Sequence, residues 1–173
     1  ANPLSPAAGE APARSMDVPA KIAFSKQVDL QPLRDLAVFH NGRVKILDTL
    51  ARETVSTITG RSSYFDYIIV GDAESAKATA KRVRFDPMFT YMDMLIDPDF
   101  YANRPLIGVE YLPLREAFLK KLYTSESEIE WWKRDGRLKP VDVARVWETV
   151  AQEEGFNPAA RQSLNRMQVA IDL

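Results

Sequence analysis

Residues 36–60 read LAVFHNGRVKILDTLARETVSTITG, and this stretch decides how the first half of the chain folds. Asn41-Gly42 stands between two short runs rich in apolar residues. Asn-Gly is the strongest two-residue signal for a β-hairpin, because a type I′ turn needs positive φ at both central positions. We therefore predict a hairpin over residues 36–47.

The second strand of this hairpin alternates basic and apolar residues. Arg43 and Lys45 alternate with Val44 and Ile46. Successive side chains of a strand point to opposite faces, so one face should be exposed to solvent and the other buried. We expect the two basic side chains to face solvent and the two apolar ones to pack inward.

A helix should follow the hairpin directly. Asp48 has the side chain of an N-cap residue, and Gly60 is a good C-terminal stop. Apolar or small residues recur between them at helical spacing: Leu50, Ala51, Thr54, Val55 and Ile58. This pattern predicts a helix over residues 49–59.

The segment Gly42–Asp48 recurs loosely as Gly136–Asp142, with the shared pattern Gly-Arg-apolar-Lys-x-apolar-Asp. Under a functional interpretation, the basic side chains form two cationic prongs for a carboxylate, a phosphate or a porphyrin propionate. Under an architectural interpretation, each glycine makes a positive-φ turn, each aspartate caps a helix, and the basic groups are solvated. The sequence favours the architectural interpretation and leaves open whether Arg43, Lys45, Arg137 and Lys139 converge.

The remaining patterns predict a predominantly α-helical α+β fold with a small antiparallel hairpin. Residues 1–27 are rich in proline and alanine and lack apolar periodicity, so we expect an extended arm or linker. Residues 28–173 should form a single globular domain. The predicted elements before residue 112 are a strand at 64–70, a helix at 72–83, a helix opened by Asp86-Pro87 and an extended run at 106–111. Four further helices are predicted: at 113–122, after Thr124 or Ser125, at 142–153 and after Asn157-Pro158.

Composition excludes several classes of function. Lys plus Arg number 23 and Asp plus Glu number 24, which gives no basic field for nucleic acid. With no cysteine and one histidine, thiolate catalysis and the usual zinc sites are excluded. No apolar run reaches the roughly 20 residues that span a bilayer. No motif pairs a nucleophile with a base, so we expect no catalytic activity from this domain alone.

The stretch Leu36–Gly60 resembles an extracytoplasmic segment of system II cytochrome c biogenesis proteins, of the CcsA/ResC type and the fused ResB–ResC type. Their pattern runs roughly His/x-x-Gly-Arg-Val-Lys-Pro-Leu-Asp-Thr-Leu-Ala. The matching residues are Gly42, Arg43, Val44, Lys45, Leu47, Asp48, Thr49, Leu50 and Ala51. Ile46 stands where the family has proline, whereas the second copy does have Pro140 there.

The resemblance implies an extracytoplasmic, periplasmic domain of a membrane-bound machine that attaches haem to apocytochrome c. The family's tryptophan-rich haem-handling signature is missing, so only an accessory, non-catalytic interaction role carries over. The implied partners are apocytochrome c, a partner subunit or the membrane-embedded parent chain. The candidate binding residues are Arg43, Lys45, Asp48, Thr49, Arg52, Arg137, Lys139 and Asp142.

A rival interpretation is a haem or small-anion carrier. Imidazole binds iron well, so His40 is a candidate axial haem ligand beside the basic Gly-Arg-x-Lys motifs. A lone histidine near a turn is more often a surface residue, and we expect no cofactor in this domain under the leading interpretation.

Overall fold

The computed structural model describes residues 16–70, 79–155 and 157–172. These residues form an α+β fold that is mainly helical, as predicted. The helices are α1 (Val18–Gln27), α2 (Gln31–Arg34), α3 (Leu47–Thr59), α4 (Pro87–Ile96), α5 (Pro98–Ala102), α6 (Leu112–Leu122), α7 (Glu126–Asp135), α8 (Pro140–Glu154) and α9 (Pro158–Asp172).

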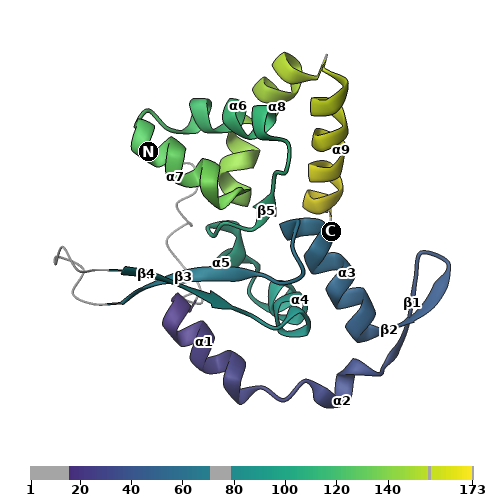
Figure 1. Cartoon of the computed structure of the whole chain (residues 1–173). Helices are drawn as coiled ribbons and strands as arrows, with labels where there is room; N and C mark the ends of the chain where they lie inside the picture. The colour runs from purple at the N-terminus through teal and green to yellow at the C-terminus, as the bar shows by residue number, and fades with distance from the viewer. Residues whose placement is uncertain (1–15, 71–78, 156, 173) are drawn as a thin grey trace, which may run out of the picture.

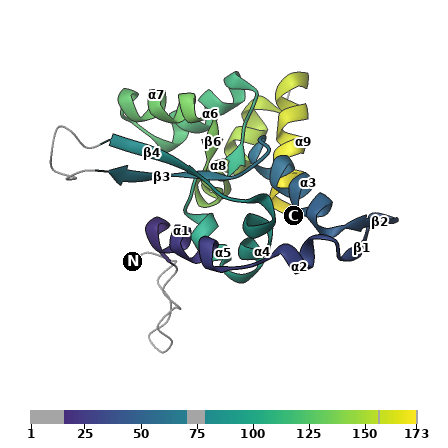
Figure 2. The same cartoon turned by 60° about the horizontal axis from the view of Figure 1, so that its bottom comes forward.

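The strands pair into three separate antiparallel ribbons of two strands each. They are β1 (Ala37–His40) with β2 (Arg43–Ile46), β3 (Phe65–Val70) with β4 (Thr79–Arg84), and β5 (Ile107–Gly108) with β6 (Arg137–Leu138). In Figure 1 the β3–β4 ribbon crosses the molecule between α6–α9 above and α1, α2 and α4 below. The β1–β2 hairpin projects from one end in both views (Figures 1 and 2).

Several helix boundaries follow the predicted signals. Asp86 caps α4, because its carboxylate accepts from the backbone N–H groups of Met88 and Phe89. Asn157 does the same for α9, accepting from the N–H groups of Ala159 and Ala160. The hairpin prediction is also confirmed: Asn41 and Gly42 have φ of 50° and 77°, the left-handed values that a type I′ turn needs.

Asp48 is not the N-cap of α3, which corrects the prediction. The helix begins at Leu47, its N-cap position is Ile46, and no side chain caps it. Asp142 likewise lies in the first turn of α8, behind the N-cap residue Lys139. Both carboxylates still lie at the positive end of a helix dipole, which is favourable.

The helix predicted at 72–83 is wrong for its described part. Residues 79–84 form strand β4, and residues 72–78 lie outside the described residues. Helix propensity is a weak prior that tertiary context overrides. Here β4 pairs along its whole length with β3, from Phe65↔Arg84 to Val70↔Thr79.

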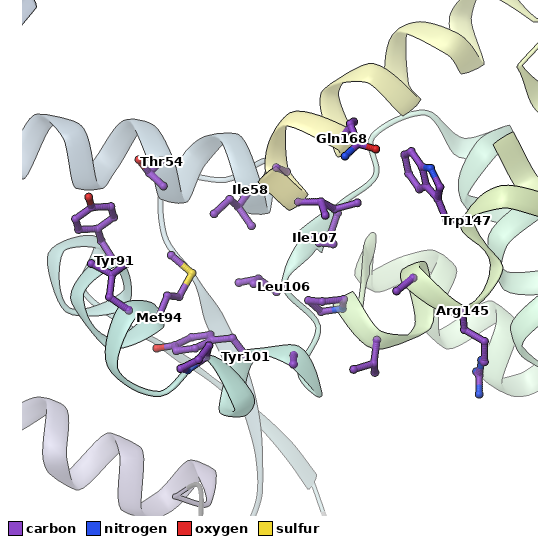
Figure 3. Close-up of a pocket in the computed structure, with 18 of the residues that line it drawn as sticks. Thr54, Ile58, Tyr91, Met94, Tyr101, Leu106, Ile107, Arg145, Trp147 and Gln168 are labelled. Carbon is purple, nitrogen blue, oxygen red and sulfur yellow. The ribbon is translucent and has the colours of Figure 1, made fainter. Parts of the chain in front are cut away.

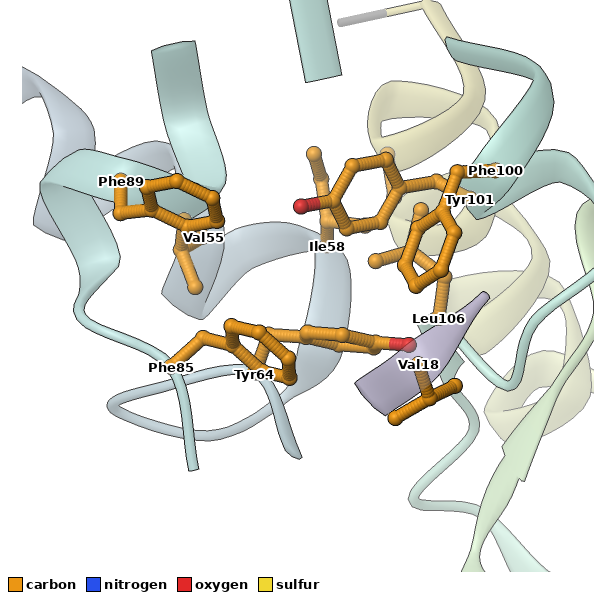
Figure 4. Packing of buried hydrophobic residues seen from close by; sticks show 10 residues of the cluster. Val18, Val55, Ile58, Tyr64, Phe85, Phe89, Phe100, Tyr101 and Leu106 are labelled. Atoms are coloured by element: carbon orange, nitrogen blue, oxygen red, sulfur yellow. The ribbon is translucent and has the colours of Figure 1, made fainter. Parts of the chain in front are cut away.

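Two main hydrophobic clusters form the core, and a smaller third cluster joins α3 to α4. One main cluster joins α1, α3, β3, α4 and α5, and it is rich in aromatic rings (Figure 4). The rings of Tyr64 and Tyr101 meet edge to face there, with centroids 5.4 Å apart. The other main cluster lies among α6, α7, α8 and α9 and includes Phe118, Leu119 and Met167.

The predicted extended arm is wrong for residues 18–27, which form helix α1. Asp17 caps this helix, and Pro19 sits in its first turn, where proline is tolerated. Its anchor is Lys21, only 1% exposed, whose ammonium group lies 3.0 Å from Asp93 and 2.7 Å from Asp97. A buried lysine breaks the apolar periodicity that would have revealed the helix. Residues 1–15 lie outside the described residues.

Replacing Lys21 with methionine should lower the free energy of unfolding by ~3–5 kcal/mol, because Asp93 then keeps a buried charge without its cation. Urea unfolding measures this loss. Adding Asp93→Asn to Lys21→Met should recover part of it. Lys26→Met, on the exposed side of the same helix, should change the free energy by less than ~0.5 kcal/mol. Equal effects of the two lysine variants would contradict this role of Lys21.

Candidate functional site

The outer face of the β1–β2 hairpin is apolar and exposed, opposite to the prediction for its second strand. Phe39 is 77% exposed, and Val44, directly across from it, is 73% exposed. Leu36 and Ile46 add exposed apolar area at the base of the hairpin. Lys45, by contrast, lies on the half-buried inner face.

The inner face is fixed by α3, which begins directly after β2. Val38 packs against the cluster of Leu47, Leu50 and Met88. Lys45, across from Val38, reaches Glu53 of α3 in an ion pair. Because Val38 and Lys45 occupy the side that faces the helix, the period-2 alternation forces Phe39 and Val44 outward.

Asp48 holds the base of the hairpin through two ion pairs. Its carboxylate receives hydrogen bonds from Arg52, at 2.6 Å, and from Arg34 of α2. Arg34 also binds Asp86, the cap of α4, at 2.9 Å. The hydrogen bond from Arg52, with that from Arg34, holds the pKa of Asp48 below its ordinary value. This network ties α2, α3 and α4 together below the hairpin.

The remaining predicted residues at or near the first copy, Arg43, Thr49 and His40, do not come together around a common binding partner. Arg43 is exposed beside the turn, opposite His40, and it forms no ion pair within the described residues. Thr49 is half-buried in the first turn of α3. His40 belongs to no group of side chains that could hold a metal ion in the described part of the chain.

In the second copy, Gly136–Asp142, the basic side chains contact other residues of the same chain. Arg137 is 1% exposed, and its guanidinium binds Asp135 in two hydrogen bonds of 2.9 and 3.0 Å. A third hydrogen bond goes to the carbonyl of Phe65. Lys139 lies over the ring of Trp132, 5.3 Å from its centroid. Arg137 is therefore a structural group and not a free prong.

The two copies share local geometry but do not converge. Gly42 and Gly136 have φ of 77° and 83°, and each is followed by a short strand and then a helix. Asp48 pairs with Arg52 in one copy, and Asp142 pairs with Arg145 in the other. The β1–β2 hairpin nevertheless projects from the end of the molecule, whereas β6 lies inside it (Figure 2). The paired motif is architecture.

A cleft of about 860 Å³ is the second notable surface feature. Tyr91, Met94 and Tyr101 line one side and Trp147 the other, with Leu106 between them (Figure 3). Its walls come from α3, α4, α5, α8, α9 and β5, and most of its lining is apolar. Its volume falls within the range of about 300–1,000 Å³ that is typical of ligand pockets. None of the predicted site residues lines it.

The described residues contain no helix long and apolar enough to span a bilayer. They hold no group of three or more acidic or histidine side chains arranged for a metal ion. Comparisons of the chain with protein-family models, curated proteins and solved structures return no match.

Sequence reasoning missed the hairpin's outer face and the cleft for different reasons. The exposure of Phe39 and Val44 could not be predicted, because the alternation of side chains along a strand defines two faces but does not tell which face packs against α3. An aromatic residue directly across from a valine, beside an Asn-Gly turn, was the available signal. The cleft combines residues as distant as Thr54 and Ile171, and no local pattern indicates it.

Asp48→Asn should lower the free energy of unfolding by ~1 kcal/mol at neutral pH, because it removes the charge that Arg34 and Arg52 bind. The folded pKa is depressed, so the contribution is fully present above the unfolded pKa of about 3.9 and is lost as the pH falls through the folded value. Urea unfolding from pH 7 to pH 2 should show the two proteins converging in acid.

The exposed neighbour Asp35 supplies the matched control. Asp35→Asn should leave the free energy of unfolding within ~0.5 kcal/mol at every pH. A gap between wild type and Asp48→Asn that stays constant down to pH 2 would show that the ion pairs do not cause it.

Proposed function

We propose that this chain is a non-catalytic extracytoplasmic interaction domain of a system II cytochrome c assembly protein, tethered to the membrane through its parent chain. The resemblance that motivates the proposal covers residues 36–60, which fold into the β1–β2 hairpin and α3. The matching residues build that unit: Gly42 makes its turn and Asp48 secures its base. In this proposal the segment that resembles the family, residues 36–60, presents a projecting hairpin that α3 and the ion pairs of Asp48 hold in place.

The observation that carries the proposal is the exposure of Phe39 and Val44. Aromatic and β-branched residues directly across an antiparallel pair stabilise each other, so the two side chains form one continuous apolar surface. Ile46 lies on the same face by the strand alternation and extends it. An aromatic anchor on a rigid support is the usual centre of a protein–protein interface, because little entropy is lost when it is buried.

The hairpin's edges favour an extended polypeptide as the partner. β1 and β2 pair only with each other in the described residues, so both outer edges keep backbone groups available. An extended segment can add as a third strand at one edge, and its alternate side chains then pack beside Phe39 and Val44 on the apolar face. Unfolded apocytochrome c is such a polypeptide, and a loop of a partner subunit or of the membrane-embedded parent chain is the other source.

The haem or anion carrier has less support from the geometry. Arg137 is buried and paired with Asp135, and Lys45 is paired with Glu53. His40 lies on the hairpin and does not line the large cleft. Haem titration of the wild type and of His40→Ala separates the two functions: a Soret shift that depends on His40 would favour the carrier.

The double variant Phe39→Ser/Val44→Ser should weaken binding at least ~10-fold, because it removes the apolar surface at the centre of the interface. The measurement is capture of the purified domain by reduced apocytochrome c peptide and, separately, by the membrane core of the assembly machine. Circular dichroism should match wild type, and the Tm should fall only slightly, because both side chains are exposed and lose only their contact with each other.

Ile96→Ser provides a control of the same kind, because Ile96 is a comparably exposed apolar residue at the end of α4. It should bind as wild type does. Capture by neither partner, together with an unchanged yield of mature cytochrome c after deletion of the domain, would reject the proposed function.

A further inference from the structure

One face of the β3–β4 ribbon combines aromatic and basic side chains. Phe65 lies directly across from Arg84 and Tyr67 directly across from Arg82, so the four side chains share a face. Helix α7 covers part of this face, where the rings of Tyr67 and Trp131 meet with centroids 5.4 Å apart. Both views place the ribbon alongside α7 (Figures 1 and 2).

Three guanidinium groups surround the ring of Phe65. The guanidinium carbons of Arg137, Arg82 and Arg61 lie 3.5, 4.2 and 5.4 Å from its centroid. Phe65 and Arg137 are buried, whereas Arg61 and Arg82 are exposed. The buried pair therefore forms a floor, and the two exposed arginines lie at the surface above the same ring.

Among the described residues, two buried carboxylates close to the ribbon already bind other groups. Asp135 binds Arg137 and the hydroxyl of Tyr67. Asp66 points to the opposite face of the ribbon, where Arg104 holds it in two hydrogen bonds of 2.6 and 2.9 Å. In the part of the chain that the structure describes, Arg61, Arg82 and Arg84 form no ion pair with an acidic side chain.

Arg115 extends the positive charge toward α6. Within the described residues its guanidinium donates only to backbone carbonyls, among them those of Val109 and Lys133 at 2.8 and 2.7 Å. Burial and the positive charge of Arg61 lower the pKa of Arg115, which shows that the two guanidinium groups repel each other. The whole chain has a formal net charge of −1, so this local excess is not a general property of the protein.

We propose that Arg61 and Arg82, supported by Arg84 and Arg115, bind a phosphate group at this face. Guanidinium forks match phosphate oxygens bidentately, and stacking over an aromatic ring leaves their edge N–H groups available. A bound phosphate offsets the mutual repulsion of the arginines. The phosphate belongs either to a lipid headgroup or to a free phosphate compound. The site is independent of the hairpin, so its failure leaves the proposed function intact.

The first test compares inorganic phosphate with chloride at equal ionic strength. Phosphate near saturation should raise the wild-type Tm by ~2–4 °C more than chloride does, because it binds only the folded protein. The double variant Arg61→Gln/Arg82→Gln should lose this difference. Arg145→Gln, an exposed arginine on α8, should keep it.

Vesicle flotation then identifies the source of the phosphate. Flotation with phosphatidylglycerol vesicles but not with phosphatidylcholine vesicles, lost in Arg61→Gln/Arg82→Gln, supports a lipid headgroup. A Tm response to phosphate without flotation supports a free phosphate compound. The proposal is overturned if neither response occurs, or if either response persists unchanged in the double variant.

Discussion

The buried guanidinium of Arg137 is the contact on which the rest of the structure depends. It joins the turn after α7 to β3, which is 72 residues earlier in the chain, through the carbonyl of Phe65. It also neutralises Asp135 and stacks 3.5 Å from the centre of the Phe65 ring. Without it, the buried carboxylate of Asp135 would lose its cation and the carbonyl of Phe65 would lose this hydrogen bond, which is costly in a dry interior. The β3–β4 ribbon is thereby fixed against α7, and the arginine-rich face takes its shape.

The two Gly-Arg-x-Lys-x-x-Asp segments show how one local geometry serves two purposes. Each has a left-handed glycine, a short strand and a helix with aspartate in its first turn. In the second copy β6 pairs with β5 inside the molecule, so Arg137 is buried and binds Asp135 and the carbonyl of Phe65. In the first copy the strand belongs to a projecting hairpin, so Arg43 stays exposed and the apolar residues face outward. Burial, and not the motif, decides what each basic side chain does.

The predictable parts of the fold are those with local signals. Asn41-Gly42, Asp86-Pro87 and Asn157-Pro158 place a turn and two helix starts because their backbone chemistry is self-contained. Strand β4 was missed, since its helix propensity yields to pairing with β3. Helix α1 was missed because its anchor is a buried lysine and not an apolar stripe. At the candidate site, the sequence identified the hairpin but assigned its faces wrongly, and Arg61 and Arg82 carried no motif that would single them out.

The proposed function depends on the hairpin making contact with a partner through Phe39. A photo-crosslinking phenylalanine analogue at position 39 keeps the aromatic ring, and the same analogue at position 96 samples an equally exposed apolar site elsewhere. Under the proposed function, irradiation of membranes that contain the parent chain should give a crosslink from position 39 to apocytochrome c or to a subunit of the proposed assembly machine, and none from position 96. No crosslink from position 39, or the same products from both positions, would contradict the proposal that the hairpin is the interaction surface.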